Sequence, residues 1–207
     1  MQTTNIKKLV LATGNAGKLR EMQALLQTLD IKVLPQSAFS VPECPEPHCT
    51  FIENALAKAR HASLLTGLPA LADDSGLCVE ALQGAPGVHS ARYACEMASD
   101  KKSDAANNAK LLKVLETEEN RHAYYYCVMV LVRYADDPQP LISEGIWAGE
   151  ILSVPRGTGG FGYDALFLDD KTSQTAAELA PAIKNRISHR AQALNKLLLK
   201  LENIQHG

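Results

Sequence analysis

Apolar residues follow two different spacings along this chain, and their alternation predicts an α/β fold. Residues 7–12 (KKLVLA) predict a buried strand, which the turn TGNAGK follows at once. A short strand is expected at 32–34, before a proline-rich loop. Thr50 and Glu53 then match a capping box that opens a helix ending near Thr66. Between the first two strands, the apolar residues recur at helical spacing and predict a helix through Leu19, Met22, Leu25, Leu26 and Leu29.

The second half of the chain repeats this alternation and adds a hairpin. Residues 104–116 predict an amphipathic helix. Two long apolar segments, 124–134 and 141–152, flank the polar turn ADDPQP and should pair as a hairpin. A last helix is expected from Ser188. Strands and helices in this order predict a mixed α/β sheet, with two lobes around a cleft as one arrangement.

Two adjacent acids, Asp73 and Asp74, end the apolar run 68–72, which predicts another buried strand. Ligands in α/β folds usually bind where strands leave the sheet. Because neighbouring side chains of an extended backbone point to opposite faces, the two carboxylates need not share one role. One can hold a hard divalent cation while the other orients or deprotonates water. The alternative is a polar Asp-Asp-Ser-Gly turn without a site.

Composition excludes several classes of protein. The chain has 207 residues, 46% hydrophobic and 21% charged, as expected for one large globular domain or two joined lobes. A net charge of −2 argues against a broad basic face for nucleic acid, so an anionic ligand needs a local cluster of cations. The longest apolar run, 124–132, is too short to span a membrane. Without an apolar leader and with five scattered cysteines, we expect a cytoplasmic protein with reduced thiols.

The first loop has the chemistry of an anion site. It joins a strand to a helix N-terminus, where free N–H groups and the helix dipole favour negative charge, and Lys18 adds a cation. It is not a Walker A loop, because the four-residue spacer and the Ser or Thr after the lysine are missing. A tight turn with a surface lysine is the alternative. The residues of this expected site are Thr13, Gly14, Asn15, Ala16, Gly17 and Lys18.

A second glycine-rich segment, GTGGFG at 157–162, matches the dinucleotide fingerprint only formally. It follows a hairpin strand and continues into FGYDALF, which reads as extended, so a dinucleotide-binding fold is rejected. A flexible clamp is more plausible, with Phe161 as a platform on which a base stacks. The alternative places Phe161 in the core.

Positive charge gathers in KNRISHR, near the start of the last helix. Ser188 is a good N-cap, which puts His189 and Arg190 in the first turn. Cations are unfavourable at that end of a helix dipole, so an anion or a carbonyl-rich ligand would explain them together with Lys184. A solvated basic turn is the alternative.

Six sequence blocks, in order, resemble one known family. They are TGNAGK, TFIENALAKAR, ADDSGL, GAPGVHSARYA, GTGGFGYD and SHR. Together they resemble the inosine triphosphate pyrophosphatase family of house-cleaning nucleotide hydrolases, also known as the Ham1 or RdgB-like family. The resemblance covers nearly the whole chain. It implies a single domain over 1–207, with an elongated mixed α/β fold, two lobes around a central nucleotide-binding cleft, and usually a homodimer. The implied reaction is hydrolysis of noncanonical purine nucleoside triphosphates (ITP, dITP, XTP) to monophosphate and pyrophosphate with Mg2+.

The resemblance also implies roles for individual residues. Asp74 resembles the metal-binding catalytic acid that activates water, with Asp73 as its partner. Lys18 and Lys58 would offset charge on the phosphates. The residues implied for substrate contacts are 13–18 for the triphosphate, Ser75, then Phe161, Gly162, Tyr163 and Asp164 for the base and sugar, and Lys184, His189 and Arg190 for base and phosphate.

The second metal-side acid is less well defined by the sequence. The loop before the helix reads EPHCT where the commoner family pattern is Glu-Thr-Gly-x-Thr. Glu46 is favoured over Glu43.

Substrate choice should depend on the purine 6-position. A carbonyl there can accept hydrogen bonds from Arg190 or backbone N–H groups, whereas the amino group of adenine would leave such donors unpaired. Two alternatives remain: a Maf-like pyrophosphatase acting on modified pyrimidine triphosphates, and a nucleotide-binding sensor without turnover.

Overall fold

A six-stranded sheet organises the structure, which is a computed structural model describing residues 6–26, 31–97 and 101–206. Leu29, expected on the first helix, lies outside these residues. The strands are β1 (Lys8–Leu11), β2 (Lys32–Pro35), β3 (Ala70–Val79), β4 (His122–Val132), β5 (Leu141–Ile151) and β6 (Phe167–Asp169). The helices are α1 (Ala16–Leu26), α2 (Phe51–Thr66), α3 (Asp104–Val114), α4 (Pro181–Ile187) and α5 (His189–His206), with short 3-10 turns η1 (Gln36–Phe39), η2 (Glu80–Leu82) and η3 (Gly87–Arg92).

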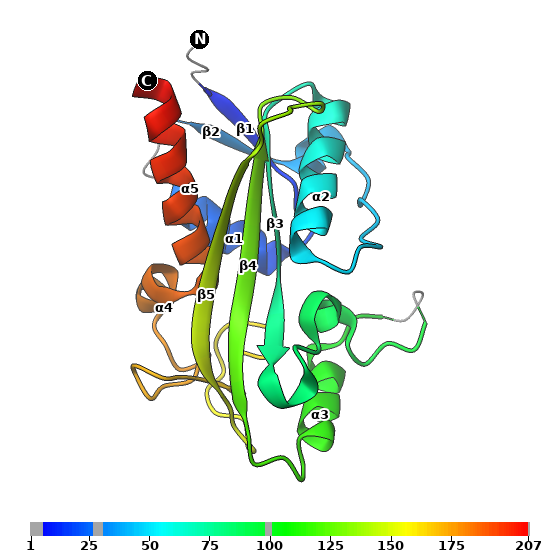
Figure 1. Ribbon diagram of the computed structural model, residues 1–207, viewed down its shortest axis with the longest axis vertical. Helices are drawn as coiled ribbons and strands as arrows, with labels where there is room; N and C mark the ends of the chain where they lie inside the picture. Colours follow the sequence, from blue (N-terminus) through cyan, green and yellow to red (C-terminus); the bar gives the residue numbers. More distant parts are fainter. Residues whose placement is uncertain (1–5, 27–30, 98–100, 207) are drawn as a thin grey trace. The chain divides into compact units, whose positions relative to one another are not determined.

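The order of strands in the sheet is β2-β1-β3-β4-β5-β6 (Figure 1). β1 pairs in parallel with both β2 and β3, whereas β5 and β6 are antiparallel. The predicted mixed α/β class is therefore confirmed, and so is the hairpin of β4 and β5, which are neighbours in the sheet. Among the residues that the structure describes, no helix has the length and apolarity that crossing a bilayer requires.

The chain divides into two compact units, each built from separate segments. The first unit contains Met1–Asp74, Cys127–Gly145 and His189–Gly207, and the second contains Ser75–Tyr126 and Ile146–Ser188. β3, β4 and β5 each contribute to both units. The central cleft and the single family domain over 1–207 stay predictions.

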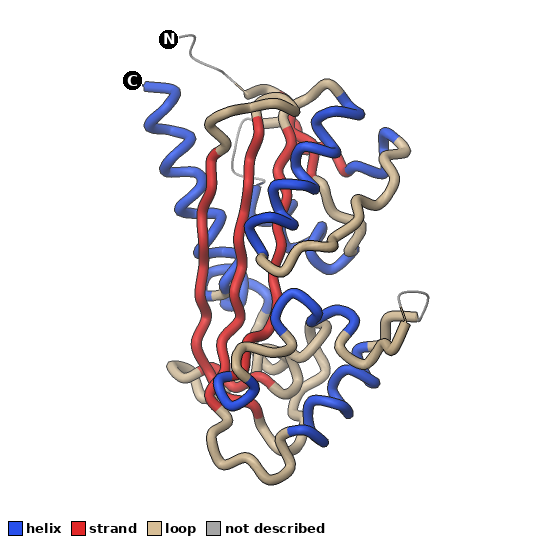
Figure 2. Tube along the Cα trace, turned by 45° about the vertical axis from the view of Figure 1, so that its right-hand side comes forward, coloured by secondary structure: helices blue, strands red, loops and turns tan. Residues whose placement is uncertain are grey.

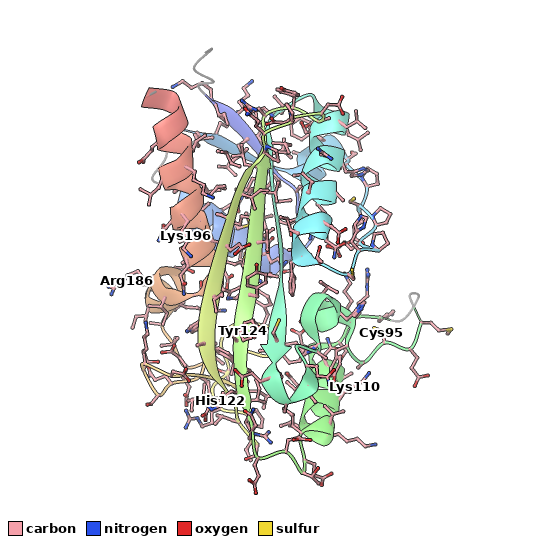
Figure 3. The ribbon with its side chains drawn as sticks, in the orientation of Figure 1. Cys95, Lys110, His122, Tyr124, Arg186 and Lys196 are labelled. Carbon is pink, nitrogen blue, oxygen red and sulfur yellow. The ribbon has the colours of Figure 1, made fainter. Side chains whose placement is uncertain are left out.

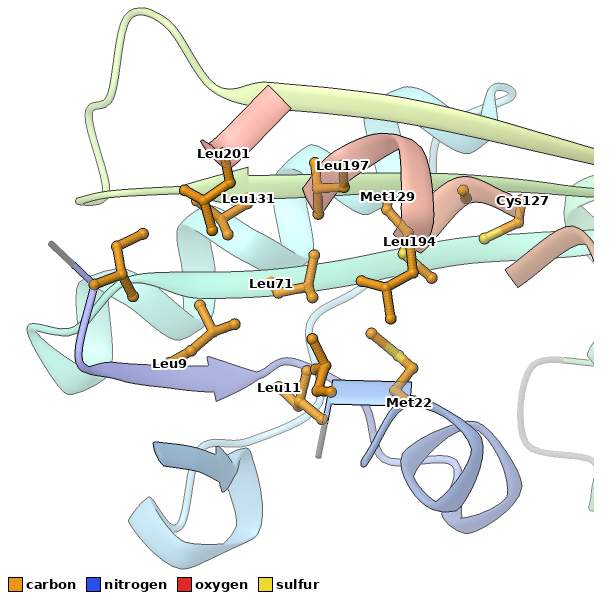
Figure 4. Close-up of a cluster of buried hydrophobic side chains, with 13 residues drawn as sticks. Leu9, Leu11, Met22, Leu71, Cys127, Met129, Leu131, Leu194, Leu197 and Leu201 are labelled. Carbon is orange, nitrogen blue, oxygen red and sulfur yellow. The ribbon is translucent and has the colours of Figure 1, made fainter. Parts of the chain in front are cut away.

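Alternation along the strands sorts the core of the first unit onto two faces. Leu9, Leu11 and Leu71 belong to one cluster with residues of α1 and α5, among them Met22 and Leu194 (Figure 4). The intervening residues of β1 and β3 point the other way, toward α2, which contacts β1 through a face of buried alanines. Helices therefore cover both faces of this part of the sheet (Figure 2).

α5 lies directly on β5 because β5 has a glycine at the contact. A Cβ on Gly145 would come within 1.9 Å of the His189 carbonyl oxygen. Next to it, the Ser143 hydroxyl donates to the Ala193 carbonyl at 2.7 Å. Lys196, labelled in Figure 3, donates to the Glu144 carbonyl at 2.9 Å. These contacts fix the start of α5, where His189 and Arg190 lie.

An aromatic cluster forms the centre of the second unit. The ring of Phe167 lies 4.7 Å from that of Tyr125 and 5.1 Å from that of Trp147, centroid to centroid. The Trp147 indole N–H donates to the buried Asp169 carboxylate at 2.6 Å, so the indole nitrogen has a hydrogen-bond partner.

Three local predictions need correction. The strand expected at 68–72 continues to Val79, so the acid pair lies inside β3, and Ser75-Gly76 is not a turn. Gly76 instead permits a close approach, since a Cβ there would lie 2.2 Å from the Gly87 carbonyl oxygen. The segment FGYDALF at 161–167 was expected to be extended, but it forms turns at 162–166 before β6 begins, and α4 was not predicted. By contrast, the capping box is confirmed, because the Thr50 side chain accepts the Glu53 N–H and α2 ends at Thr66.

Replacing Asp169 by Asn should destabilise the protein, and more at neutral than at acid pH. Burial raises the pKa of this carboxyl, but hydrogen bonds from Thr172 and Trp147 outweigh burial and lower it. A lowered pKa means that ionised Asp169 stabilises the fold above the ordinary carboxyl pKa of about 4, and that this contribution is lost as pH falls. We expect a loss of about 1–2 kcal/mol at pH 7 and a smaller loss near pH 3.

Urea unfolding followed by fluorescence of Trp147, the one tryptophan of the sequence, measures this difference. Asp170→Asn is the matched control, because this neighbouring carboxylate is exposed. Equal midpoints for Asp169→Asn and Asp170→Asn at pH 7 would contradict the prediction.

Candidate active site

Asp73 and Asp74 point to opposite faces of β3 and meet different partners. Asp73 shares the face of Leu71, toward α1 and α5. There its carboxylate lies 2.9 Å from Lys18 Nζ and 3.5 Å from Arg190 Nε, and its side chain is fully buried. The Arg190 guanidinium also pairs with Glu21 of α1 at 2.5 Å. Asp73 is thus the centre of an ion-pair network that links β3, α1 and α5.

Asp74 shares the face of Ala72, toward α2. Its Oδ2 accepts from the Asn54 side-chain amide at 3.2 Å, and its Oδ1 lies 3.1 Å from Lys58 Nζ. Asn54 and Lys58 are one helical turn apart on α2, so both reach the same carboxylate. The same Lys58 Nζ also contacts the Glu46 carboxylate at 2.5 Å. One ammonium group therefore joins two carboxylates from separate segments.

The surroundings shift the pKa values of the two acids in opposite directions. Burial raises the pKa of Asp73, but the charges of Lys18, Arg190 and Lys58 outweigh it and hold the pKa well below its usual range. Burial also raises the pKa of Asp74, and here the lysine charges do not fully compensate, so the pKa remains raised. The surroundings of Asp73 thus favour its ionised form, whereas burial favours the protonated form of Asp74.

The two candidate second acids occupy different places. Glu46 lies at Lys58, and through it near Asp74. Glu43 lies over the first loop, where its Oε1 would be 3.2 Å from a Cβ built on Gly14. The role of Glu46 as the second metal-side acid stays a prediction. Within the described part of the chain, no three His, Cys, Asp or Glu side chains form a group that could hold a metal ion.

The first loop is a capped helix start with exposed backbone. The Asn15 side-chain oxygen accepts the N–H groups of Gly17 at 2.8 Å and Lys18 at 3.1 Å, and the Thr13 hydroxyl accepts the Asn15 N–H. Gly14, Asn15 and Ala16 are exposed. The expected binding of phosphate by residues 13–18 stays a prediction. The Lys18 side chain, in contrast, extends from this loop to Asp73.

In the second unit, Asp164 is the centre of another buried network. Its carboxylate accepts from the Phe161 N–H at 2.9 Å and from the Tyr125 hydroxyl at 3.3 Å. Lys184 Nζ lies 2.7 Å away, and both charged side chains are less than one-tenth exposed. The same ammonium lies 5.1 Å from the centroid of the half-buried Phe161 ring. Asp164 and Lys184 therefore both hold Phe161, the first through its backbone N–H and the second through its ring.

The remaining predicted residues have varied surroundings. Tyr163 belongs to the core of the second unit and donates from its hydroxyl to the Ser90 carbonyl at 2.9 Å. His189 and Arg190 are buried at the start of α5, so a solvated basic turn is wrong for them and for Lys184. Ser75 is half-buried in β3. Substrate contacts of these residues, and of Gly162 beside Phe161, stay predictions.

Three partners of the site were missed by sequence reasoning. Asn54 had a signal, because it precedes Lys58 by four residues and therefore shares a helix face with it. Glu21 and Tyr125 had none, since each meets its partner across a long sequence separation.

Comparison with known proteins agrees with the sequence blocks. Residues 9–200 match the sequence model of the Ham1 family. A dITP/XTP pyrophosphatase from Ralstonia nicotianae is 59% identical over 98% of this chain and 100% of the relative. One from Chromobacterium violaceum is 62% identical over 94% and 97%, respectively.

Solved structures give the same result for the fold. A HAM1 protein from Coxiella burnetii superposes with a TM-score of 0.86 at 50% identity, covering 96% of this chain and 100% of that one. The Ham1 protein from Staphylococcus aureus gives 0.83 at 37% identity, with 95% and 99% covered. The resemblance carried by the six sequence blocks is thereby confirmed: this chain belongs to the Ham1 family.

Proposed function

We propose that this protein hydrolyses noncanonical purine nucleoside triphosphates (ITP, dITP and XTP) to the monophosphate and pyrophosphate. The observation that carries the proposal is the pair of oppositely directed acids on β3, each paired with a lysine. In phosphoryl transfer, fixed cations offset the negative charge that develops on the phosphate. A carboxylate beside them can accept a proton from the attacking water. The names and full-length overlap of the relatives, dITP/XTP pyrophosphatases from two organisms, support the same substrate class.

The carboxylates near Lys58 fit a divalent cation, and we infer that it is Mg2+. Asp74 and Glu46 both contact the Lys58 ammonium, so one oxygen of each carboxylate is directed at the same positive charge. Mg2+ in nucleotide enzymes usually takes one or two carboxylates and completes its shell with water and phosphate oxygens. A bound Mg2+ neutralises phosphate charge and makes water more acidic. Two carboxylates of this kind suffice, and a third protein ligand is not needed.

In this reaction, the side chains would have distinct tasks. Asp74 accepts a proton from the attacking water or orients that water, and Asn54 fixes the direction of its carboxylate. Lys58 and Lys18 offset charge on the phosphates and on the leaving pyrophosphate. Asp73 holds Lys18 in place through their ion pair and does not itself need to touch substrate.

Base recognition is assigned to the loop of Phe161. Its half-buried ring offers a face for stacking, and Lys184, which pairs with Asp164 and lies 5.1 Å from the ring centroid, helps to hold that ring in place. A purine 6-carbonyl can accept hydrogen bonds from backbone N–H groups of the site, whereas the 6-amino group of adenine would leave such donors unpaired at about 1–3 kcal/mol each. Arg190 was expected to read the base, but its contacts with Glu21 and Asp73 support a positioning role on the phosphate side.

The homodimer and the cytoplasmic location implied at the outset are kept as proposals. Reduced cysteines suit a reducing compartment, and none of the cysteines, all of which the structure describes, forms a disulfide (Cys44, Cys49, Cys78, Cys95 and Cys127). Sedimentation of the purified chain tests the dimer: a monomer at micromolar concentration would exclude it.

A panel of triphosphates with Mg2+ tests the function. We expect monophosphate and pyrophosphate from ITP, dITP and XTP, with kcat/KM at least about 100-fold lower for ATP, because adenine leaves site donors unpaired. Chromatographic separation of the monophosphate, diphosphate, pyrophosphate and phosphate identifies the bond that breaks. Preference for dTTP or UTP would support a pyrimidine-directed enzyme instead, and tight binding of ITP without product would support a sensor.

Asp74→Asn tests the assignment of the catalytic acid. We expect kcat for ITP to fall by at least about 100-fold, as is usual on loss of a general base, while ITP binding by calorimetry remains measurable. Asp136→Asn is the control, because it makes the same change at an exposed acid of the first unit. Near-normal turnover in Asp74→Asn would remove Asp74 from the mechanism.

Phe161→Ala tests the stacking platform. Loss of one base-stacking contact should weaken binding of ITP and XTP alike, by about 5- to 100-fold. Inorganic tripolyphosphate, which has no base, should inhibit the variant and the parent enzyme equally. Weaker tripolyphosphate inhibition in the variant would show that Phe161 acts on the phosphate side.

A further inference from the structure

The peptide groups on both sides of Phe161 are held by carboxylates. The Phe161 N–H donates to Asp164 Oδ2 at 2.9 Å, and the Gly162 N–H donates to Asp104 Oδ2 at 2.7 Å. Asp164 is buried within the second unit, whereas Asp104 is an exposed residue of the first turn of α3. With both flanking peptides fixed, the backbone dihedrals of Phe161 are fixed, and with them the direction of its Cα–Cβ bond.

A second residue of α3 holds the next peptide. The Asn108 side-chain amide donates to the Gly162 carbonyl at 3.0 Å. Asp104 and Asn108 are four residues apart and therefore lie on one face of α3. Gly162 has φ +63°, a left-handed conformation that glycine adopts without strain. The helix thus binds both the N–H and the C=O of a single glycine.

α3 is itself firmly attached to the unit that it supports. The buried Asn107 side chain donates to the Ser90 and Ala91 carbonyls and accepts the Ala94 N–H. Lys110, labelled in Figure 3, donates to the Tyr93 carbonyl at 2.6 Å. A helix held by these contacts can restrain the loop that it binds.

The loop needs such restraint because of its sequence. Residues 157–162 contain four glycines, and glycine loses more backbone freedom on ordering than any other residue. A stacking ring on an unrestrained loop would lose that freedom at each binding event and so weaken binding. Contacts that order the loop beforehand remove this cost.

We propose that Asp104 and Asn108 are positioning residues that hold Gly162 and thereby fix Phe161 for stacking on the substrate base. The consequence for binding rests on the proposed function, but the restraint itself does not. Neither residue touches the substrate; both act through the backbone of the loop.

The first experiment measures the restraint without nucleotide. Hydrogen–deuterium exchange of the full-length chain is followed by mass spectrometry in peptides that cover residues 159–165. Asp104→Ala and Asn108→Ala should each raise exchange in this segment by about tenfold, as expected for loss of one hydrogen bond. Asp104→Asn should raise it less, because its amide oxygen still accepts.

Ser103→Ala is the matched control. Ser103 is the N-cap of α3 and accepts the Ala106 N–H at 3.2 Å, so this change weakens the helix start without removing a contact to Gly162. Exchange in 159–165 should stay at the parent level. A rise equal to that of Asp104→Ala, or no rise in either alanine variant of Asp104 and Asn108, would overturn the proposal.

The second experiment measures the consequence for the base. Both alanine variants should raise KM for ITP by about five- to tenfold, keep kcat within about twofold, and leave inhibition by inorganic tripolyphosphate unchanged. Equal loss of ITP and tripolyphosphate affinity would overturn the link to the base. Absence of pyrophosphate release by the parent enzyme would instead refute the proposed function, and the exchange experiment would still decide whether the restraint exists.

Discussion

Strand geometry at Asp73 and Asp74 is the constraint on which the rest of the site depends. Successive residues of β3 point to opposite faces, so two adjacent carboxylates are separated by the sheet itself. The face of Leu71 and Asp73 meets α1 and α5, and the face of Ala72 and Asp74 meets α2. A register shift of one residue would exchange these environments and place each acid among the wrong partners. The different surroundings of the two acids are therefore fixed by backbone pairing.

Burial makes this arrangement costly unless each charge is paired. An isolated carboxylate in the core is strongly disfavoured, and removing one partner of a buried ion pair costs more than the pair contributes. Asp73 has Lys18 and Arg190, whose own helices begin close to it, and Arg190 is balanced by Glu21. The contact of α5 with β5 at Gly145 sets where Arg190 lies. The packing of α5 on β5 thus affects the electrostatics of Asp73 through Arg190.

Much of the fold followed from local signals in the sequence, whereas the pairing of charges did not. The capping box at Thr50 and Glu53 placed α2 correctly, because both ends of that helix are encoded within it. The length of β3 was underestimated, since Asp-Asp-Ser-Gly has turn propensity that ion pairs from α1, α2 and α5 override. Such ion pairs join residues far apart in the sequence; Arg190 and Glu21, for example, are 169 residues apart. Sequence blocks named the acids and lysines of the site but not the geometry that separates their roles.

The two faces of β3 also differ in how completely their formal charges cancel. On the Asp73 face, two anions (Asp73, Glu21) meet two cations (Lys18, Arg190), and the sum is zero. On the Asp74 face, the Lys58 ammonium pairs with two carboxylates, Asp74 and Glu46, so these three groups together carry one formal negative charge in excess. Charges that cancel within a group leave only a weak field around it, whereas a net negative charge attracts cations. The Asp74 face of β3 should therefore attract cations more strongly than the Asp73 face, where the ion pairs only hold the helices and the strand together.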